Sequence, residues 1–276
     1  MSDPLSSPRT GPNGPTMTPQ HRALRVGSHP WTIATGGRLT TAERWRLVPP
    51  MLAAHASMAV GRSASALRIS RGRRRRLHID IDELAPPSSI LTRVAASHAT
   101  SRLSRSLLNH SMRTYAFGAA LGLLDGRHVD RELLFTAALL HDVGLSGGAG
   151  DGTDFTLASA ALARQVACDV GLSRRAADIV MSAITLHHSP DVRASDGAVA
   201  QLLSAGAAVD VIGLRSWELP PATIAAIVER HPRLGFKREF SAAFHAEATR
   251  VPQGRVQFLE RYAAFDLAIR LAPFPE

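Results

Sequence analysis

Three short segments of the chain place histidine and aspartate side chains within apolar surroundings that have helical spacing. The residues concerned are His110, the adjacent pair His141 and Asp142, and Asp210. A buried imidazole or carboxylate usually needs an ion pair, hydrogen bonds or a metal ion to offset its lost hydration. Two imidazoles with two carboxylates suit zinc, manganese or ferrous iron, and such a set leaves coordination positions open for water or substrate. Taken together, these residues indicate a metal site that could support chemistry.

The elements around these residues must bring them to one place. His110 begins a helical apolar pattern, so its ring is expected in the domain interior. His141 and Asp142 end an apolar helix, and neighbouring helical side chains diverge by about 100°. Both can therefore reach one ion only near the helix end, where Gly144 permits the chain to turn away. The alternative is that the histidines are hydrogen-bonded core residues and that Asp142 and Asp210 cap helices.

Apolar residues recur at three- and four-residue spacing through most of the chain after Ser88. This periodicity predicts helices over 90–108, 112–124, 131–140, 156–170, 176–186, 198–212, 221–229, 238–249 and 256–271. Because alternating β-branched runs are scarce, we predict an all-α fold.

The chain divides by composition into three parts. Residues 1–38 are rich in Pro, Gly, Ser and Thr, and we expect them to be disordered or loosely attached. Residues 39–85 are predicted to hold an N-terminal helix with a capping-like start, an arginine-rich linker and, over 78–84, a strand or extended arm. Residues 86–276 are predicted to form the metal-binding helical domain.

The charge and the cysteine content limit the partners and the cellular compartment expected for the protein. The formal net charge is +9, but almost all basic residues are arginines, and the run Arg71–Arg76 lacks interleaved aromatics. Nucleic-acid binding is therefore not expected.

The single cysteine, Cys168, excludes an internal disulfide and is expected to be buried. Without a spanning apolar run or a secretory signal, we expect a cytoplasmic protein that has no membrane partner and binds a small-molecule substrate, with homo-oligomerisation left open.

The order His, His-Asp, Asp resembles that of the HD-domain superfamily of metal-dependent hydrolases. Within it, residues 109–113 (NHSMR) and 139–144 (LLHDVG) look like the Asn-His-Ser-x-Arg and Leu-Leu-His-Asp-Ile-Gly motifs of the cyanamide hydratase-like branch. The resemblance covers residues 86–214 and implies an HD-type helical bundle. It also implies a divalent ion, zinc first with iron and manganese as alternatives, whose ligands are His110, His141, Asp142 and Asp210.

The same resemblance adds residues around the ion. His187 corresponds to a histidine close to the metal in that branch, and with Asp142 it is the predicted catalytic residue, since imidazole can act as general acid or base near neutral pH. His188 is the alternative inward histidine and a predicted substrate contact; for both, the other interpretation is a favourable position at a helix C-terminus. Asn109 and Arg113, one helical turn apart, are further predicted substrate-binding residues, with a structural ion pair as the alternative for Arg113.

The leading prediction is a metal-dependent hydrolase or hydratase, the latter a lyase by reaction class, that acts on a small nitrile-like molecule such as cyanamide through a metal-activated water. An HD-type phosphohydrolase of a nucleotide or other phosphoester is the runner-up, disfavoured because residues 143–148 carry no lysine after the His-Asp-x-Gly turn. A di-iron oxygenase-type HD protein is a further alternative, since such sites use additional histidines between the His-Asp pair and the last aspartate. Here His187 and His188 are the two histidines in that interval, and because one helix end supplies both, a second metal is disfavoured. A non-catalytic binding module is the remaining alternative.

Overall fold

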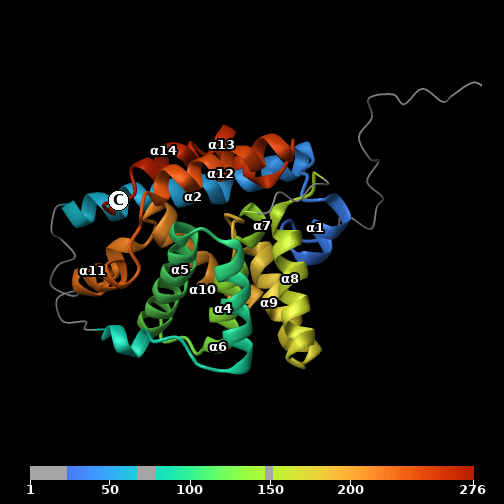
Figure 1. The fold of residues 1–276 in the computed structure, drawn as a ribbon. Helices are drawn as coiled ribbons and strands as arrows, with labels where there is room; N and C mark the ends of the chain where they lie inside the picture. The colour runs from blue at the N-terminus through green and yellow to red at the C-terminus, as the bar shows by residue number, and fades with distance from the viewer. Residues whose placement is uncertain (1–23, 67–78, 147–151) are drawn as a thin grey trace, which may run out of the picture.

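The computed structural model describes residues 24–66, 79–146 and 152–276, and Figure 1 shows that these parts fold as a helical bundle. Within the described ranges there is no strand, and extended pairing is limited to one isolated bridge between Arg38 and Gly254. The predicted all-α fold is therefore confirmed. The elements in chain order are α1 (His29–Thr35), α2 (Thr41–Ala66), η2 (Ile81–Leu84), α4 (Ile90–Arg102), α5 (Arg105–Leu124), α6 (Arg131–Leu140), α7 (Val143–Ser146), α8 (Phe155–Asp169), α9 (Arg174–Leu186), η3 (Ala194–Asp196), α10 (Ala198–Ile212), η4 (Ser216–Glu218), α11 (Pro221–Arg230), α12 (Phe236–Arg250), α13 (Arg255–Tyr262) and α14 (Phe265–Arg270).

Two groups of helices make up the fold. Helices α4, α5, α6, α8, α9 and α10 form a bundle, and α2, α12, α13 and α14 run across one end of it (Figure 1). Helix α10 packs closely along α5 because glycines face the neighbouring backbone: a Cβ at Gly206 would collide with the Thr114 carbonyl oxygen, and one at Gly118 with the Leu202 carbonyl oxygen. This close crossing brings the middle of α10 to the part of α5 that carries His110.

Helix α6 delivers the His-Asp pair to the bundle interior. Its N-cap, Asp130, accepts hydrogen bonds from the Glu132 and Leu133 backbone N–H groups, and every residue from Leu133 to Leu140 is buried. Gly144 follows the pair, and a Cβ there would collide with the Phe155 carbonyl oxygen at the start of α8. The glycine is therefore required by this close backbone approach. It lies within the short helix α7 and is not among the glycines with positive φ, so the turn that the sequence suggested does not depend on it.

Several predicted boundaries were wrong, because local capping or backbone conformation interrupts the expected helices. The expected helix 90–108 is broken at Ser104, whose side chain accepts a hydrogen bond from the Leu107 N–H and starts α5. The expected helix 256–271 is also divided, at Ala264, whose backbone is left-handed with a φ of 45° and which makes no side-chain cap. The predicted strand or arm over 78–84 is instead the short helix η2, capped by Asp80, and residue 78 lies outside the described residues. Apolar spacing continues across such breaks, so periodicity cannot reveal them.

The N-terminal prediction needs a partial correction. Residues 1–23 and the arginine run 71–76 lie outside the described residues. Residues 29–35, expected to be loosely attached, form α1 instead, because Trp31 is fully buried and its indole N–H donates to Glu43 Oε1 at 2.8 Å. Glu43 also accepts from the Thr40 backbone N–H at 2.8 Å, which confirms the capping-like start of α2.

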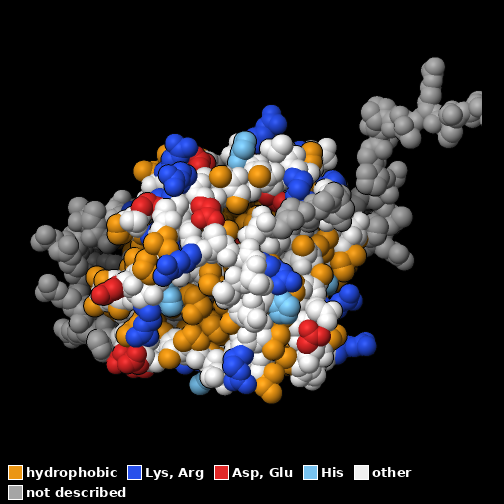
Figure 2. Space-filling model, in the orientation of Figure 1, with side chains coloured by type: hydrophobic (Ala, Val, Ile, Leu, Met, Phe, Trp, Pro, Cys, Tyr) orange, Lys and Arg blue, Asp and Glu red, His pale blue; other side chains and the backbone are white. Residues whose placement is uncertain are grey.

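The surface differs from the sequence expectation in one respect. Cys168 is exposed, because it lies on the outer side of α8 next to the buried Val166 and Ala167. On the face in Figure 2, Lys and Arg side chains are scattered among acidic ones. Among the described helices, none combines the length and apolar character that crossing a membrane requires.

Candidate metal centre

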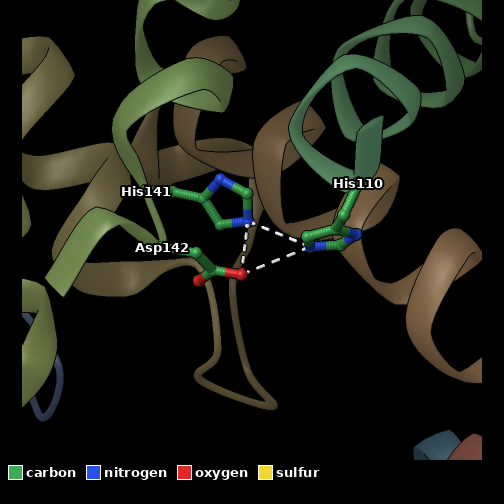
Figure 3. Close-up of side chains that lie close together, drawn as sticks. All are labelled: His110, His141 and Asp142. Carbon is green, nitrogen blue, oxygen red and sulfur yellow. Dashed lines mark hydrogen bonds and ion pairs between the residues drawn. The ribbon is translucent and has the colours of Figure 1, made fainter. Parts of the chain in front are cut away.

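Three potential ligands meet where α5 and the end of α6 come together. One atom each from His110, His141 and Asp142 lies within 4.8 Å of the other two, and Figure 3 shows the three side chains pointing toward one another. All three residues are buried. His110 Nε2 lies 3.3 Å from Asp142 Oδ2, and His141 Nε2 lies 3.2 Å from the same oxygen.

Hydrogen bonds on the far side of each ring orient the histidines of this site. His141 Nδ1 donates to the Ala138 carbonyl oxygen at 2.7 Å, and His187 Nδ1 donates to the Ile184 carbonyl oxygen at 2.7 Å. Because a carbonyl only accepts, Nδ1 of each ring carries the proton and Nε2 of the neutral ring presents a lone pair. His187 Nε2 lies 3.5 Å from Asp142 Oδ1, so it faces the cluster as well.

The donor set fits a cation. Neither carboxylate oxygen of Asp142 has a hydrogen-bond partner among the described residues, although the side chain is buried. Here a buried carboxylate faces imidazole nitrogens that present lone pairs, so several hydrogen-bond acceptors meet without a donor. This arrangement is energetically costly unless a cation or protons lie between the acceptor atoms. Such a group of imidazole nitrogens and one carboxylate is the kind of set that binds zinc or ferrous iron.

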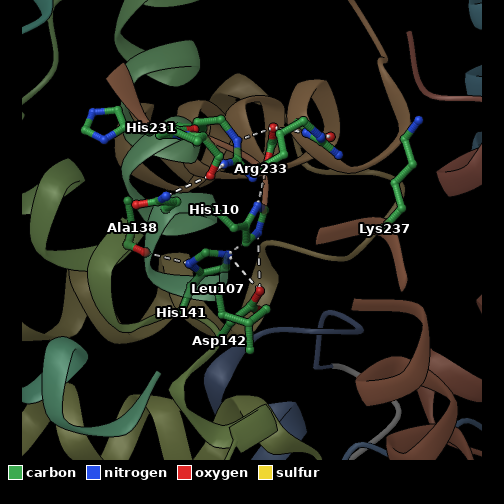
Figure 4. A network of polar contacts seen from close by, with 12 residues as sticks. Leu107, His110, Ala138, His141, Asp142, His231, Arg233 and Lys237 are labelled. Carbon is green, nitrogen blue, oxygen red and sulfur yellow. Dashed lines mark hydrogen bonds and ion pairs between the residues drawn. The ribbon is translucent and has the colours of Figure 1, made fainter. Parts of the chain in front are cut away.

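Asp210 lies behind His110 and is held by arginines. Its Oδ2 is 2.7 Å from His110 Nδ1 and accepts from Arg113 Nη2 at 2.8 Å. Its Oδ1 accepts from Arg113 Nε at 2.7 Å and from Arg233 Nη1 at 2.6 Å. Figure 4 shows this network running from His141 and Asp142 through His110 to Arg233. Asp210 is therefore outside the cluster of three, and its direct ligation of an ion stays a prediction.

The charge network shifts the pKa values in this part of the site. Burial alone would raise the pKa of Asp210, but the Arg113 guanidinium and the hydrogen bond to His110 hold that pKa well below its ordinary value. For His110, burial lowers the pKa, but the adjacent Asp142 and Asp210 carboxylates outweigh burial and raise the pKa above its ordinary value. An ion bound at His110 Nε2 would have to displace any proton held there.

Aromatic side chains of α12 close the site around His110. The Phe236 ring stacks on the His110 ring with centroids 4.7 Å apart and planes 22° apart, and the guanidinium carbons of Arg113 and Arg233 lie 5.2 Å and 4.8 Å from the Phe236 centroid. The ring is thereby fixed from its face as well as from Nδ1. Sequence reasoning missed Arg233 and Phe236, because nothing in the apolar pattern distinguishes an arginine or phenylalanine that packs on a site from one elsewhere.

A second buried network, also missed, holds the histidines at the end of α9. Arg255 Nη2 donates to Asp154 Oδ2 at 2.8 Å, and Arg255 Nη1 donates to the Thr185 carbonyl oxygen at 2.6 Å and to Ser189 Oγ at 3.2 Å. These bonds tie α13 and the N-cap of α8 to both sides of the histidine pair at 187–188. The network explains why the chain can leave α9 with both histidines turned inward.

His187 and His188 both line one cavity, contrary to the expectation that only one could face inward. Helix α9 ends at Leu186, and His187 keeps helical dihedrals. The chain then turns, with the Ser189 N–H bound to the Leu186 carbonyl oxygen at 2.8 Å, and the two imidazole rings lie 5.0 Å apart. His188 stacks on Phe155 at 5.3 Å, and neither of its ring nitrogens has a hydrogen-bond partner among the described residues. Burial and the neighbouring His141 imidazole lower the pKa of His187 to about 4, and burial and Arg255 hold the pKa of His188 well below its ordinary value.

A cavity with a volume of about 340 Å³ lies next to the cluster of His110, His141 and Asp142. Its wall includes His110, His141, Asp142, His187 and His188, so these predicted site residues share one space.

The two other predicted substrate-binding residues are outside the cavity wall. Asn109 Nδ2 donates to the Pro232 carbonyl oxygen at 2.7 Å, and the fully buried Arg113 binds Asp210 and the His231 carbonyl oxygen. Their contact with a substrate stays a prediction, and the bonds described here favour the structural alternative for Arg113.

Comparison with known proteins agrees with the geometry at the level of the domain. Residues 107–229 match the family model of the HD domain, and this segment includes all the residues of the cluster. The chain is similar to cyanamide hydratase DDI2 and cyanamide hydratase DDI3 of Saccharomyces cerevisiae. Each is 26% identical over 179 residues, which cover 63% of this chain and 80% of the relative. These similarities support a metal-dependent hydrolase or hydratase as the general class.

Proposed function

We propose that this HD-domain protein is a metal-dependent hydratase of small, uncharged, nitrile-like molecules. In this proposal His110, His141 and Asp142 hold one divalent ion, zinc first. The observation that carries the proposal is the convergence of two imidazole Nε2 atoms, with a third close by, on a buried carboxylate that has no hydrogen-bond donor among the described residues. The names of the two yeast relatives support the choice of a nitrile-like substrate.

Asp210 acts through His110 in this proposal. Its two oxygens accept from two guanidiniums and from His110 Nδ1. A carboxylate bound to the distal nitrogen of a metal-binding histidine fixes its tautomer and orientation. We therefore assign Asp210 a positioning role, in place of the direct ligation that the family resemblance implied.

His187 is the proposed general base. When bound, a divalent ion supplies a Lewis acid that lowers the pKa of a coordinated water toward neutrality. His187 is neutral at pH 7 because burial lowers its pKa to about 4, and its Nδ1–H is engaged by Ile184. A proton can therefore be accepted only at Nε2, the atom that faces Asp142.

The charges of the cavity wall disfavour a phosphoester substrate. Among the wall residues that the structure describes, Arg215 is the one with a permanent positive charge. Its guanidinium is already bound to Glu218 at 2.6 Å and to Asp125 at 2.9 Å. A phosphate in the cavity would find Arg215 already paired with acidic side chains and would be repelled by the Asp142 carboxylate. An uncharged substrate would not be subject to this electrostatic penalty.

Metal analysis and turnover test the proposal together. We expect the purified protein to hold one divalent ion per chain and, after chelation and reloading with zinc, to convert cyanamide to urea. His141→Ala and Asp142→Ala should lose both the ion and the activity, while His128→Ala, a change at an exposed histidine outside the cluster, should keep both. Wild-type metal content in the Asp142→Ala variant, or hydrolysis of phosphomonoesters without urea formation, would contradict the proposal.

A further inference from the structure

The cavity next to the cluster is much larger than a molecule such as cyanamide needs. Its volume of about 340 Å³ compares with the ~30 Å³ that one water takes in the liquid. By that measure the cavity accommodates on the order of ten non-hydrogen atoms. Pockets that bind small organic ligands begin at about 300 Å³. The cavity is therefore large enough for a ligand that has a reactive group, its head, and an attached organic group, its body.

One wall of the cavity is a continuous stripe of α10. Gln201, Ser204, Ala205, Ala208, Val211 and Ile212 contribute to it, and they recur at the three- and four-residue spacing of a single helix face. From residue 201 to residue 212 a helix rises by about 16 Å. Most of these side chains are small or apolar, so they leave an elongated trough along the helix.

A second part of the wall is mainly apolar and adaptable. On α2, Met51, Ala54 and Met58 line the cavity together with His55, whose ring nitrogens are engaged with the Met51 and Ala263 carbonyl oxygens, and α12 adds Phe240 and Phe244. The two methionines and two phenylalanines are each at least nine-tenths buried. Methionine side chains are flexible and polarisable, so they can pack against aliphatic or aromatic groups of different shape.

Polar groups in the wall are few and specific. Besides the histidine cluster, the Gln201 side chain has a buried Oε1 atom without a hydrogen-bond partner among the described residues. An unpaired acceptor of this kind calls for an N–H or O–H donor on whatever binds there. The Arg215 guanidinium is already paired with Asp125 and Glu218, so the wall offers little positive charge to attract an anion.

From these observations we propose that the substrate is an uncharged molecule with an electrophilic carbon next to the histidine cluster and an aliphatic or aromatic body of on the order of ten non-hydrogen atoms along α10. The body buries apolar surface against α2 and α12, and a donor group on it binds Gln201. This inference rests on the proposed function for the head group, and it makes an N-substituted cyanamide or organic nitrile a better substrate than cyanamide itself.

Binding of unreactive probes tests the inference separately from turnover. Urea, n-propylurea, n-butylurea and n-hexylurea resemble the hydration products, and their affinity for zinc-loaded protein can be measured by calorimetry. We expect each added methylene to tighten binding about fourfold, the factor that corresponds to burial of one methylene group. n-Hexyl phosphate, with the same body and a charged head, should bind at least tenfold more weakly than n-hexylurea.

Two neighbouring alanines on α2 supply a matched pair of variants. Ala54→Phe fills the cavity and should abolish the dependence on chain length, whereas Ala56→Phe, on the exposed side of the same helix, should leave it unchanged. Met58→Ala enlarges the cavity and should move the best ligand to a longer chain, which provides a second test if Ala54→Phe does not fold.

The outcomes separate the inference from the proposed function. Equal affinity for urea and n-hexylurea, or an unaltered length dependence in folded Ala54→Phe, would overturn the inference even if cyanamide is hydrated. A length dependence that responds to Ala54→Phe supports the inference, even in a protein that hydrates neither cyanamide nor n-hexylcyanamide, a result that would count against the proposed function alone.

Discussion

Replacing Asp210 by Asn removes one buried charge while keeping the shape of the side chain. Arg113 and Arg233 are almost fully buried, and Asp210 receives three of their hydrogen bonds at 2.6–2.8 Å. Removing one partner of a buried ion pair costs about 3–5 kcal/mol, because an uncompensated charge is left behind. Against a typical total stability of about 5–15 kcal/mol, Asp210→Asn should be among the most destabilising conservative changes in the chain.

The assay is urea unfolding of chelated protein, because the predicted loss requires no metal ion. The matched control is Asp142→Asn, which removes a buried carboxylate that has no hydrogen-bond donor among the described residues. An amide there can donate to an imidazole Nε2, so we expect the control to change the free energy of unfolding by less than about 1 kcal/mol.

Zinc affinity provides the second measurement on the same two proteins. Changing a residue that orients a metal-binding histidine typically weakens binding by about 10- to 100-fold. We expect Asp210→Asn to fall in that range, and Asp142→Asn to lose more affinity because it alters a ligand. If chelated Asp210→Asn protein is as stable as wild type, the carboxylate does not balance the two arginines, and the positioning role assigned to Asp210 is refuted.

Three further results are expected. Arg255 outweighs burial and lowers the pKa of Asp154 to about 2. The ionised carboxylate therefore stabilises the fold fully above about pH 4, and this contribution of about 2 kcal/mol is lost as the pH falls from 4 to 2. In urea unfolding, the difference in free energy of unfolding between wild type and Asp154→Asn should therefore shrink by about half between pH 7 and pH 3. Gly206→Ala should cost about 1–3 kcal/mol in thermal or urea unfolding, because its Cβ would collide with the Thr114 carbonyl oxygen. Zinc at a hundredfold excess over its dissociation constant should raise the free energy of unfolding by about 2.7 kcal/mol, and equal stabilisation of His141→Ala would contradict the assigned ligands.

The sequence predicts the helices of the bundle well where burial sets the pattern. Helices α6 and α10 have the bounds that the apolar spacing predicts, and most of the residues of both helices are buried in the bundle. The proximity of His110 to the His-Asp pair was also predictable, since three polar residues in apolar helical segments have few other ways to be satisfied.

The partners of Asp210 could not be predicted in the same way. Arg233 lies in a loop after α11, outside the segment that carries the family motifs, and its approach to Asp210 depends on how α12 folds over α5. The role of α2 in the cavity wall is similar: Met51 and Met58 satisfy a helical pattern, but only the tertiary arrangement shows that they face a space rather than another helix. Sequence spacing describes each helix by itself, whereas these contacts are set by packing between elements.

His110 is where the stability of the fold and the binding of an ion become linked. Its Nδ1 is bound by Asp210, its face is stacked on Phe236, and its Nε2 is directed toward Asp142. The ring is therefore oriented by contacts that exist without an ion, so binding need not order it. The same contacts depend on Arg113 and Arg233, which balance the charge of Asp210. Any change that weakens these buried ion pairs should therefore reduce the stability of the fold and the metal affinity together. A purely ligating role for His110 predicts loss of affinity with stability unchanged.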